Sequence, residues 1–318
     1  MPKKIISGLA AILALTLFSP LSALAFEINP MSNMPVEGDF VLGPGKIELF
    51  LDPGETISRD LNITNRNGKP LKVHIEVEDF TGDPDYSVKL LGSEKGPYSL
   101  RDYLKPEVTS FTLAHGEKAT LPVTVSIPKT AEPGGLFGSV IITVEPEAEN
   151  SVGGVDQTKG NVTIVSRLAT LFFVRVRGDA KEDGSLKSFT TDKKFYQKPP
   201  VNFSVVYENR GNVHLDPYAE IEIKNIFGKK VDSVEIEPYF VMPGFSRERT
   251  AAWQRDLAFG RYTATLTLNR GYGNLADEAK ATFWIVPMKV IIIALSAIFI
   301  IALLVWLLTS KFELRRKK

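Results

Sequence analysis

The side chains with the greatest potential for chemistry form an acidic run that contains Glu76, Glu78, Asp79, Asp83 and Asp85. Hard cations such as Ca²⁺ need several oxygen ligands close together, and a loop holding Asp79, Asp83 and Asp85 could supply them. The spacing is not that of an EF-hand, and acidic loops commonly stay solvated. The run also offers carboxylate pairs for glycoside hydrolysis, but no single pair stands out. The sequence therefore leaves calcium binding open and gives catalysis no clear site.

Other catalytic residue types are scarce. The chain has 318 residues, three His and no Cys, which excludes a disulfide framework, a Cys-ligated zinc site and a cysteine nucleophile. His74, His115 and His214 are isolated, and none has a second His at metal-ligand spacing, so each is expected to be structural. Hydrolase serine motifs and phosphate-binding glycine loops are missing from the sequence. We therefore predict that the protein is not an enzyme and has neither a cofactor nor a metal site.

Aromatic residues concentrate between positions 196 and 259. Trp and Tyr anchor many protein interfaces, and aromatic rings stack on sugars. Four of these residues flank turns and form our candidate recognition face: Tyr239, Phe240, Phe245 and Trp253. The alternative is that aromatic residues at alternating positions, such as Tyr207, belong to the core.

The N-terminus has the pattern of a secretory signal peptide. Lys3 and Lys4 precede an apolar run that ends in Ala23-Leu24-Ala25, a small-residue cleavage site. We predict that residues 1–25 are removed between Ala25 and Phe26. The alternative is an uncleaved membrane anchor.

The C-terminus carries a second apolar run. Residues 290–308 contain Ser296 as their one polar residue, and we predict a transmembrane helix over residues 288–309. Residues 310–318 form a basic tail, which by the positive-inside rule is expected in the cytoplasm. The predicted localisation is a single-pass cell-membrane protein with extracellular N-terminal domains. The exported part then has a net charge of about −6, which argues against a nucleic-acid partner.

Strict alternation of apolar and polar residues recurs between residues 46 and 285. Residues 71–77, 121–127, 201–207 and 262–268 show this period of two, which is the signature of a strand with one buried face. Turn residues such as Asp52-Pro53-Gly54 separate the segments. The predicted fold class is all-β, with two immunoglobulin-like β-sandwich domains and the C-terminal transmembrane helix.

The polar segment 178–185, GDAKEDGS, is the best domain boundary. We predict one β-sandwich domain over residues 26–178 and another over residues 185–286. Residues 145–160 are interpreted as a long hairpin loop, because both flanks are strand-like. A loose internal repeat relates residues 61–77 to residues 203–223, since each has a strand, an Asn-Arg turn with Gly and a second strand. Convergence on hairpin chemistry is the alternative explanation.

A further motif lies near the predicted end of the second domain. Gly260-Arg261-Tyr262 is similar to the corner of an immunoglobulin-like domain, where a Tyr at the start of a strand bonds back to the backbone. Its position near residue 286 fits that interpretation.

The order of motifs resembles the WxL-interacting surface proteins of Gram-positive bacteria. The matching segments are residues 26–30, FEINP; residues 51–56, LDPGET, leading to 61–65, LNITN; residues 115–118, HGEK; and residues 133–138, PGGLFG. The resemblance implies a peptidoglycan-binding first domain and a partner- or host-binding second domain, both immunoglobulin-like. It also implies display at the cell wall together with other surface proteins.

The predicted function is therefore non-enzymatic adhesion or scaffolding by a membrane-anchored bacterial surface protein. Its expected partners are cell-wall peptidoglycan, other cell-surface proteins, or both. Two alternatives stay open. The chain could be an accessory module of a glycan-processing enzyme, or a chaperone-like assembly factor that completes partner strands by edge pairing. An exposed, unpaired edge strand would favour the assembly factor.

Overall fold

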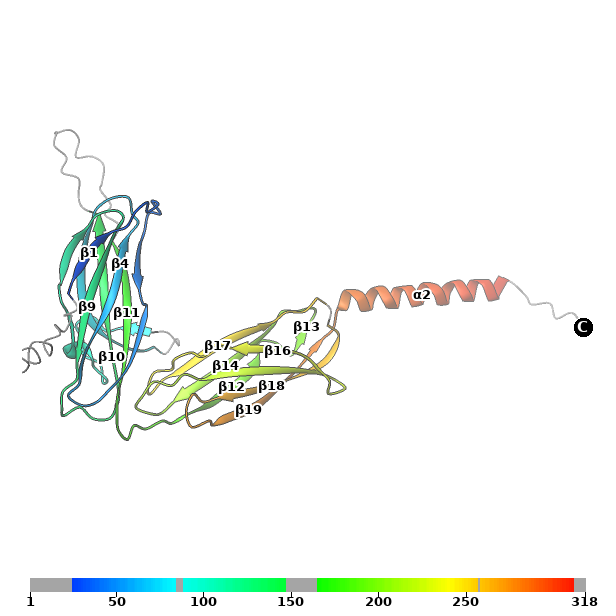
Figure 1. The fold of residues 1–318 in the computed structure, drawn as a ribbon. Helices are drawn as coiled ribbons and strands as arrows, with labels where there is room; N and C mark the ends of the chain where they lie inside the picture. Colours follow the sequence, from blue (N-terminus) through cyan, green and yellow to red (C-terminus); the bar gives the residue numbers. More distant parts are fainter. Residues whose placement is uncertain (1–24, 84–87, 147–164, 257, 312–318) are drawn as a thin grey trace, which may run out of the picture. The chain divides into compact units, whose positions relative to one another are not determined.

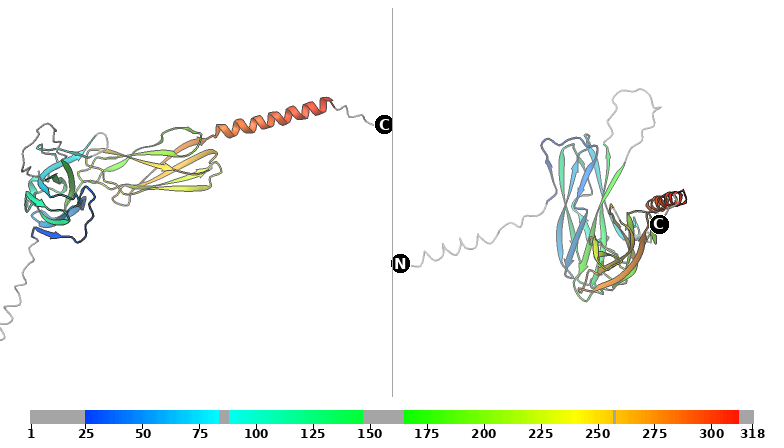
Figure 2. Two further views of the ribbon diagram at one scale, coloured as in Figure 1. Left: turned by 90° about the horizontal axis from the view of Figure 1, so that it is seen from above. Right: turned by 90° about the vertical axis from the view of Figure 1, so that its right-hand side faces the viewer.

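The chain folds into two compact units in a computed structural model that describes residues 25–83, 88–146, 165–256 and 258–311 (Figures 1 and 2). Unit 1 comprises Met1–Asp79, Gly92–Glu132 and Phe137–Val176. Unit 2 comprises Phe80–Leu91, Pro133–Leu136 and Arg177–Lys318. The predicted signal peptide lies outside the described residues except for Ala25.

The first eleven strands form two sheets. One has the order β1–β9–β4–β2, with β7 also paired to β9, and the other has the order β3–β11–β10–β5–β6, with β8 paired to β5. A 3-10 helix spans Arg101–Tyr103. The strands are β1 (Glu27–Pro30), β2 (Phe40–Gly43), β3 (Lys46–Leu51), β4 (Thr56–Asn65), β5 (Leu71–Gly82), β6 (Val88–Leu90), β7 (Leu104–Pro106), β8 (Ser110–Leu113), β9 (Glu117–Ser126), β10 (Gly134–Pro146) and β11 (Ser166–Val176).

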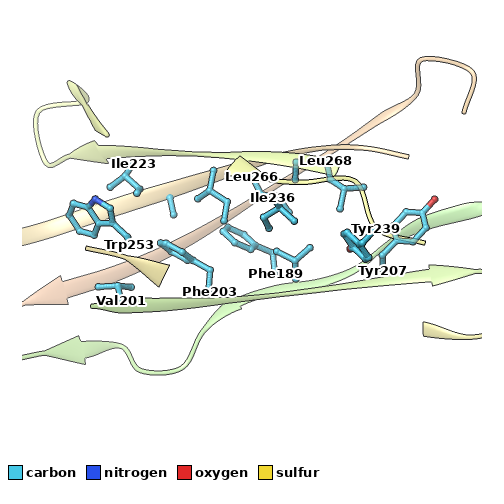
Figure 3. Packing of buried hydrophobic residues seen from close by; sticks show 14 of the residues in the cluster. Phe189, Val201, Phe203, Tyr207, Ile223, Ile236, Tyr239, Trp253, Leu266 and Leu268 are labelled. Carbon is cyan, nitrogen blue, oxygen red and sulfur yellow. The ribbon is translucent and has the colours of Figure 1, made fainter. Parts of the chain in front are cut away.

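Unit 2 is a sandwich of two further sheets, with the orders β12–β14–β17 and β13–β19–β18–β15–β16. The strands are β12 (Gly184–Thr191), β13 (Phe195–Tyr196), β14 (Val201–Asn209), β15 (Tyr218–Asn225), β16 (Lys230–Ile236), β17 (Ser246–Trp253), β18 (Gly260–Asn269) and β19 (Ala276–Ile285). Side chains from both sheets meet in one core, in which Trp253 packs edge-on against Tyr262 with ring centroids 5.3 Å apart (Figure 3). The predicted mainly β, immunoglobulin-like sandwich architecture is confirmed.

Alternating residues build these cores as the sequence predicts. On β5, Leu71, Val73 and Ile75 are buried and alternate with exposed or half-buried polar residues. The alternating apolar residues of β14, Val201, Phe203, Val205 and Tyr207, are fully buried. Strands β10 and β11, which flank residues 147–164, are neighbours in their sheet. The predicted hairpin loop itself lies outside the described residues, apart from Glu145 and Pro146 at the end of β10.

The internal repeat extends to individual hydrogen bonds. Asn65, at the end of β4, donates from Nδ2 to the carbonyls of Lys69 and Leu113 at 2.9 and 2.8 Å, and its Oδ1 accepts from the N–H of Asn67. Asn209, at the end of β14, makes the same three bonds, to the carbonyls of Val213 and Val241 and the N–H of Gly211. Both Asn side chains are fully buried. Each Asn side chain therefore satisfies one backbone N–H and two backbone carbonyls that would otherwise lack a hydrogen-bond partner.

The Tyr262 motif also behaves as the sequence suggests. The hydroxyl of Tyr262 accepts a hydrogen bond from the backbone N–H of Phe259 at 3.2 Å. Its ring is almost fully buried and stacks on Phe283 with centroids 5.8 Å apart. The start of β18 is thereby fixed to the core of unit 2.

A helix, α2 (Met288–Lys311), follows β19. A membrane-spanning helix must be both long and apolar, with about 20 consecutive apolar residues. No helix within residues 25–83, 88–146, 165–256 and 258–311 meets both conditions. This finding overturns the predicted transmembrane helix over residues 288–309, the integral membrane partnership and the predicted single-pass localisation with a cytoplasmic tail.

Candidate binding edge on strand β19

The four residues of the candidate recognition face do not share one exposed surface. Trp253 is 1% exposed, and its Nε1 donates to Asp232 Oδ2 at 2.8 Å. Tyr239 is 3% exposed. Phe240 and Phe245 are half-buried. Tyr239 and Trp253 belong to the core of unit 2, because apolar rings of this size are more stable between the two sheets than in water.

Within the acidic run, Asp79 is bonded to backbone N–H groups, and Glu76 and Glu78 pair with Arg167. Asp79 is fully buried, and its carboxylate accepts hydrogen bonds from the N–H groups of Gly96, Leu100 and Arg101 at 3.1, 3.1 and 3.0 Å. A carboxylate satisfied in this way holds a loop in place. Asp85 lies outside the described residues, so the proposed calcium loop is not tested as a whole.

The histidines hold different places in the fold. His115 Nδ1 accepts from the N–H of Gly68 at 3.2 Å, and its Nε2 faces the carbonyl of Met34 at 3.2 Å. Both ring nitrogens are therefore used to join loops of unit 1. His74 is half-buried on the polar face of β5, and His214 is buried.

The best candidate for a binding site is the free edge of β19. This strand pairs with β18 along its whole length, Gly260 to Asn269. On its other side, β13 contributes two residues, Phe195 and Tyr196, which lie opposite Trp284 and Ile285. Among the described strands, none covers Ala276–Phe283 on that side.

The hydrogen bonds next to β13 show which backbone groups of β19 face this edge. The N–H groups of Trp284 and Val286 donate to the carbonyls of Lys194 and Tyr196 at 2.9 and 2.7 Å. Because strand residues alternate in direction, the residues two, four and six positions before Trp284 present their N–H and C=O groups to the same side. These residues are Glu278, Lys280 and Thr282. They give the edge three donors and three acceptors without a strand partner in the described part of the chain.

Strand β17, an edge of the three-stranded sheet, carries two arginines on the same face as Trp253. Arg247 is half-buried and Arg249 is exposed. The Arg249 guanidinium lies 5.1 Å from the ring centre of Tyr239, and that of Arg247 lies 4.2 Å from the ring of Phe240. An inward-pointing charge such as Arg247 is a common means of preventing strand addition. Burial and the neighbouring Arg249 lower the pKa of Arg247, while burial raises the pKa of Tyr239 to about 12.

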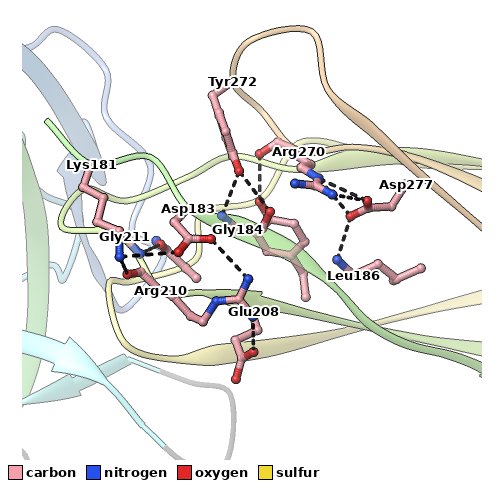
Figure 4. A network of polar contacts seen from close by, with 12 residues as sticks. Lys181, Asp183, Gly184, Leu186, Glu208, Arg210, Gly211, Arg270, Tyr272 and Asp277 are labelled. Atoms are coloured by element: carbon pink, nitrogen blue, oxygen red, sulfur yellow. Dashed lines mark hydrogen bonds and ion pairs between the residues drawn. The ribbon is translucent and has the colours of Figure 1, made fainter.

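Strand β12, which begins beside β19, has its backbone satisfied by side chains (Figure 4). The Tyr272 hydroxyl accepts from the N–H of Gly184 at 2.9 Å and donates to its carbonyl at 3.0 Å. The N–H of Leu186 donates to Asp277 Oδ2 at 2.8 Å. These bonds occupy the backbone at the start of β12, Gly184 and Leu186, beside β19.

An ion pair between Arg270 and Asp277 fixes the carboxylate that binds the N–H of Leu186 on β12. Arg270 binds Asp277 through both Nε and Nη2, and the carbonyl of Arg270 accepts from the Tyr207 hydroxyl at 3.0 Å (Figure 4). Burial opposes ionisation of Asp277, but the hydrogen bonds from Arg270 and Leu186 outweigh it and lower the pKa of this carboxyl. The Asp277 partner raises the pKa of Arg270. The pair stays charged at neutral pH and fixes the position of Asp277 near the start of β19.

The side chains along the edge suit an added strand. Ala279 and Ala281 point towards the core and are half-buried, so they leave space beside the sheet edge. Glu278, Lys280 and Thr282 are on the solvent face, where they could contact alternate side chains of a partner. The arrangement can accept an extended polypeptide through main-chain hydrogen bonds.

Sequence reasoning did not single out this edge. Alternation in residues 276–285 is weak, because small Ala residues occupy inward positions. Because β13 runs parallel to β19, the residues that could cover Ala276–Phe283 are those before Phe195. Most of them form β12 (Gly184–Thr191), which pairs with β14 in the other sheet. The sequence does not show this choice of partner.

No family model matches the chain, and no curated protein matches its sequence. Among solved structures, the chain is similar to one from a chaperone–tip adhesin complex of CFA/I fimbriae biogenesis (12% identity, 78% of this chain and 99% of that chain, TM-score 0.38). It is also similar to one from the CsuC–CsuE chaperone–tip subunit complex of Acinetobacter baumannii (11%, 76% and 98%, 0.38) and to the E. coli chaperone DraB (13%, 77% and 96%, 0.36). These identities and TM-scores are too low to carry an argument about function.

Proposed function

We propose that the chain is a non-enzymatic binding protein that holds another surface protein by strand addition along β19, as an assembly factor for surface proteins would. The observation that supports this proposal is the free edge of Ala276–Phe283, with the outward backbone groups of Glu278, Lys280 and Thr282. An exposed edge is normally a liability, and in unit 2 the half-buried Arg247 on β17 and the side-chain caps on Gly184 and Leu186 of β12 protect parts of two other edges. An edge left open in such a unit is best explained by a partner.

The resemblance to WxL-interacting proteins supports a partner from the same cell surface. Peptidoglycan binding by residues 26–178 stays a prediction of that resemblance. Strand addition would give affinity through the main chain and specificity through alternate side chains. The partner segment would therefore be extended, with small or apolar side chains opposite Ala279 and Ala281.

Two variants, each with one introduced cysteine that carries a photo-crosslinker, test this proposal. The chain itself has no Cys that would compete for the label. Thr282→Cys puts the label on the free edge. Thr265→Cys puts it on β18, in the middle of the same sheet, with strands paired on both sides. On producing cells, we expect a crosslinked surface protein at position 282 and none at 265. Equal crosslinking at both positions would indicate binding to the sheet face and would contradict strand addition.

A proline variant separates edge pairing from mere proximity. Lys280→Pro removes an outward donor but leaves the hydrogen bonds to β18, because residue 280 faces the edge. In the Thr282→Cys background it should abolish the crosslink, whereas Lys280→Ala should preserve it. Retention of the crosslink in the proline variant would overturn the proposal.

A further inference from the structure

One end of unit 2 exposes several large apolar side chains. Globular surfaces carry scattered apolar residues, but a contiguous group of aromatic ones marks an interaction site. The exposed fractions are Phe195 68%, Ile226 63%, Phe227 90%, Phe259 69% and Trp284 40%.

Strand register brings these residues to the same end of the five-stranded sheet. Trp284 lies opposite Phe195 on one side and opposite Arg261 on the other. Residues paired in this way point to the same face. Strand β15 ends at Asn225, next to Ile226, and the hairpin tip places Phe227 beyond it. Phe259 immediately precedes β18 at the same end. We call this group of five apolar residues the aromatic end.

Positive charge surrounds the aromatic end. Its basic residues are exposed: Lys193, Lys194, Lys198, Lys229 and Arg261. The nearby carboxylates are Asp192, Asp232 and Asp256, and two of them are engaged, since Asp192 accepts from the Tyr196 hydroxyl and Asp232 from the Trp253 indole. The surface therefore combines exposed rings with a surplus of cations.

A hollow adjoins the rings. Its volume is about 510 Å³, and its lining includes Lys193, Phe195, Lys198 and the carboxylate of Asp192, which accepts from the Tyr196 hydroxyl. Such a space can take up a negatively charged headgroup beside an apolar chain, because lysine supplies the countercharge and the rings supply apolar contact.

We propose that the aromatic end is a peripheral docking surface for an anionic lipid surface. Aromatic side chains favour the lipid–water boundary, and neighbouring lysines are drawn to anionic headgroups. The contact uses side chains of unit 2 and requires no spanning segment. It is also independent of the β19 edge, whose outward groups belong to residues 278–282.

The opposite end of the same sheet would not bind such a surface. It carries Tyr218 and the carboxylates of Glu220, Glu235 and Glu237, which line a hollow of about 570 Å³. Carboxylates are repelled by anionic headgroups. Tyr218 lies on β15 seven residues before Asn225, about 23 Å away at 3.3 Å per residue. The two ends therefore form a matched pair for an experiment.

The test uses the full chain with an environment-sensitive fluorophore on Phe227→Cys or, as the control, on Tyr218→Cys. Each protein is mixed with vesicles of phosphatidylcholine alone or with phosphatidylglycerol added. We expect a blue shift at position 227 with the anionic vesicles, none at 218, and reversal of the shift by high salt. Equal shifts at both positions, equal shifts with both lipids, or no shift at 227 would overturn the proposal.

A charge variant gives a second, quantitative readout. Lys193→Glu with Lys194→Glu, in the Phe227→Cys background, should raise the lipid concentration for half-maximal shift at least about 25-fold, at about fivefold for each lysine lost. Both lysines are exposed, so folding should be retained, which thermal unfolding checks. Unchanged lipid dependence in a folded variant would contradict recognition by charge.

Discussion

The two units share a chain path but differ in how they cover their last strand. In unit 1, β2 pairs antiparallel with β4, and the following β3 runs parallel to β11 over six residue pairs, Leu171 to Val176. In unit 2, β12 pairs antiparallel with β14, and the following β13 runs parallel to β19 over two pairs. The same switch between sheets therefore covers six of the 11 residues of β11 but two of the 10 residues of β19.

The length of the parallel strand decides how much of the neighbouring strand is covered. Six residues of β3 cover the second half of β11 with main-chain pairing. The two residues of β13 cover Trp284 and Ile285, and the chain before them belongs to β12, which pairs with β14. Both units are well packed beneath these strands, with Phe172 and Phe283 both fully buried. The difference between the units therefore lies at the edge and not in the core.

The largest expected effect tests what the units share. Asn65→Ala and Asn209→Ala each leave one N–H and two carbonyls without their side-chain partner. At about 1–3 kcal/mol for each unsatisfied buried group, each variant should lose about 3 kcal/mol or more of unfolding free energy. Denaturant unfolding of the two variants measures this loss.

The matched controls are Asn67→Ala and Asn212→Ala, in the same turns. These residues are half-buried or less, so the loss should be smaller. If the losses of unfolding free energy in Asn65→Ala and Asn209→Ala differed by several-fold, the two turns would not be energetically equivalent. The repeat would then be one of sequence only.

The next prediction tests the difference between the edges. The N–H of Leu171 donates to the carbonyl of Gly45 at 3.0 Å, so Arg175, four residues later on β11, also faces β3. Arg175→Pro removes a main-chain bond in a paired strand and should cost about 3 kcal/mol. Lys280→Pro removes an N–H from the free edge and should cost less than about 1 kcal/mol.

Thermal and denaturant unfolding of the two proline variants gives the comparison, with Arg175→Ala and Lys280→Ala correcting for the lost side chains. A large loss for Lys280→Pro would mean that the edge of β19 is covered in the folded protein. The proposed strand addition would then lose its main support.

Much of this architecture could be predicted from the sequence, because alternation records which face of a strand is buried. The pattern Val201, Phe203, Val205 identified β14 directly. The repeated Asn-Arg turn identified the relation between the units. Open edges leave no such record, since the N–H of Lys280 is the same group whether or not a strand lies beside it.

The candidate aromatic face shows a second limit of sequence reasoning. Tyr239 and Trp253 flank turns, which favours exposure, yet both are buried. Trp253 lies at the last position of β17 on its inward face, and register decides its direction. The exposed aromatic residues are instead at hairpin tips and strand ends, such as Phe227 and Phe259. Whether a residue near a turn points inward depends on a strand boundary that alternation places only within a few residues.

The smallest expected effect concerns pH, because the last strands of the two units, β11 and β19, hold neighbouring strands with different chemistry. Unit 1 uses main-chain pairs between β3 and β11, which do not titrate. Unit 2 uses the Asp277 carboxylate to hold the N–H of Leu186. The pKa of Asp277 is lower in the folded chain than its ordinary value of 3.8, so the unfolded chain takes up a proton first as the pH falls. The stabilisation is therefore fully present above about pH 4 to 5 and is lost as the pH falls through the lowered pKa.

Asp277→Asn tests this sign. At pH 7 the variant should lose about 1.5–3 kcal/mol, the usual value of a hydrogen bond to a charged group, and at pH 2 the difference from the parent chain should shrink. Hydrogen exchange of the Leu186 amide at both pH values gives a local readout, after correction for the intrinsic exchange rates. In the parent chain, exchange at this amide should speed up on acidification. In the variant, it should be fast at both pH values. Equal acid sensitivity in parent and variant would show that another group holds the start of β12. In that case the carboxylate would not distinguish unit 2 from the main-chain closure of unit 1.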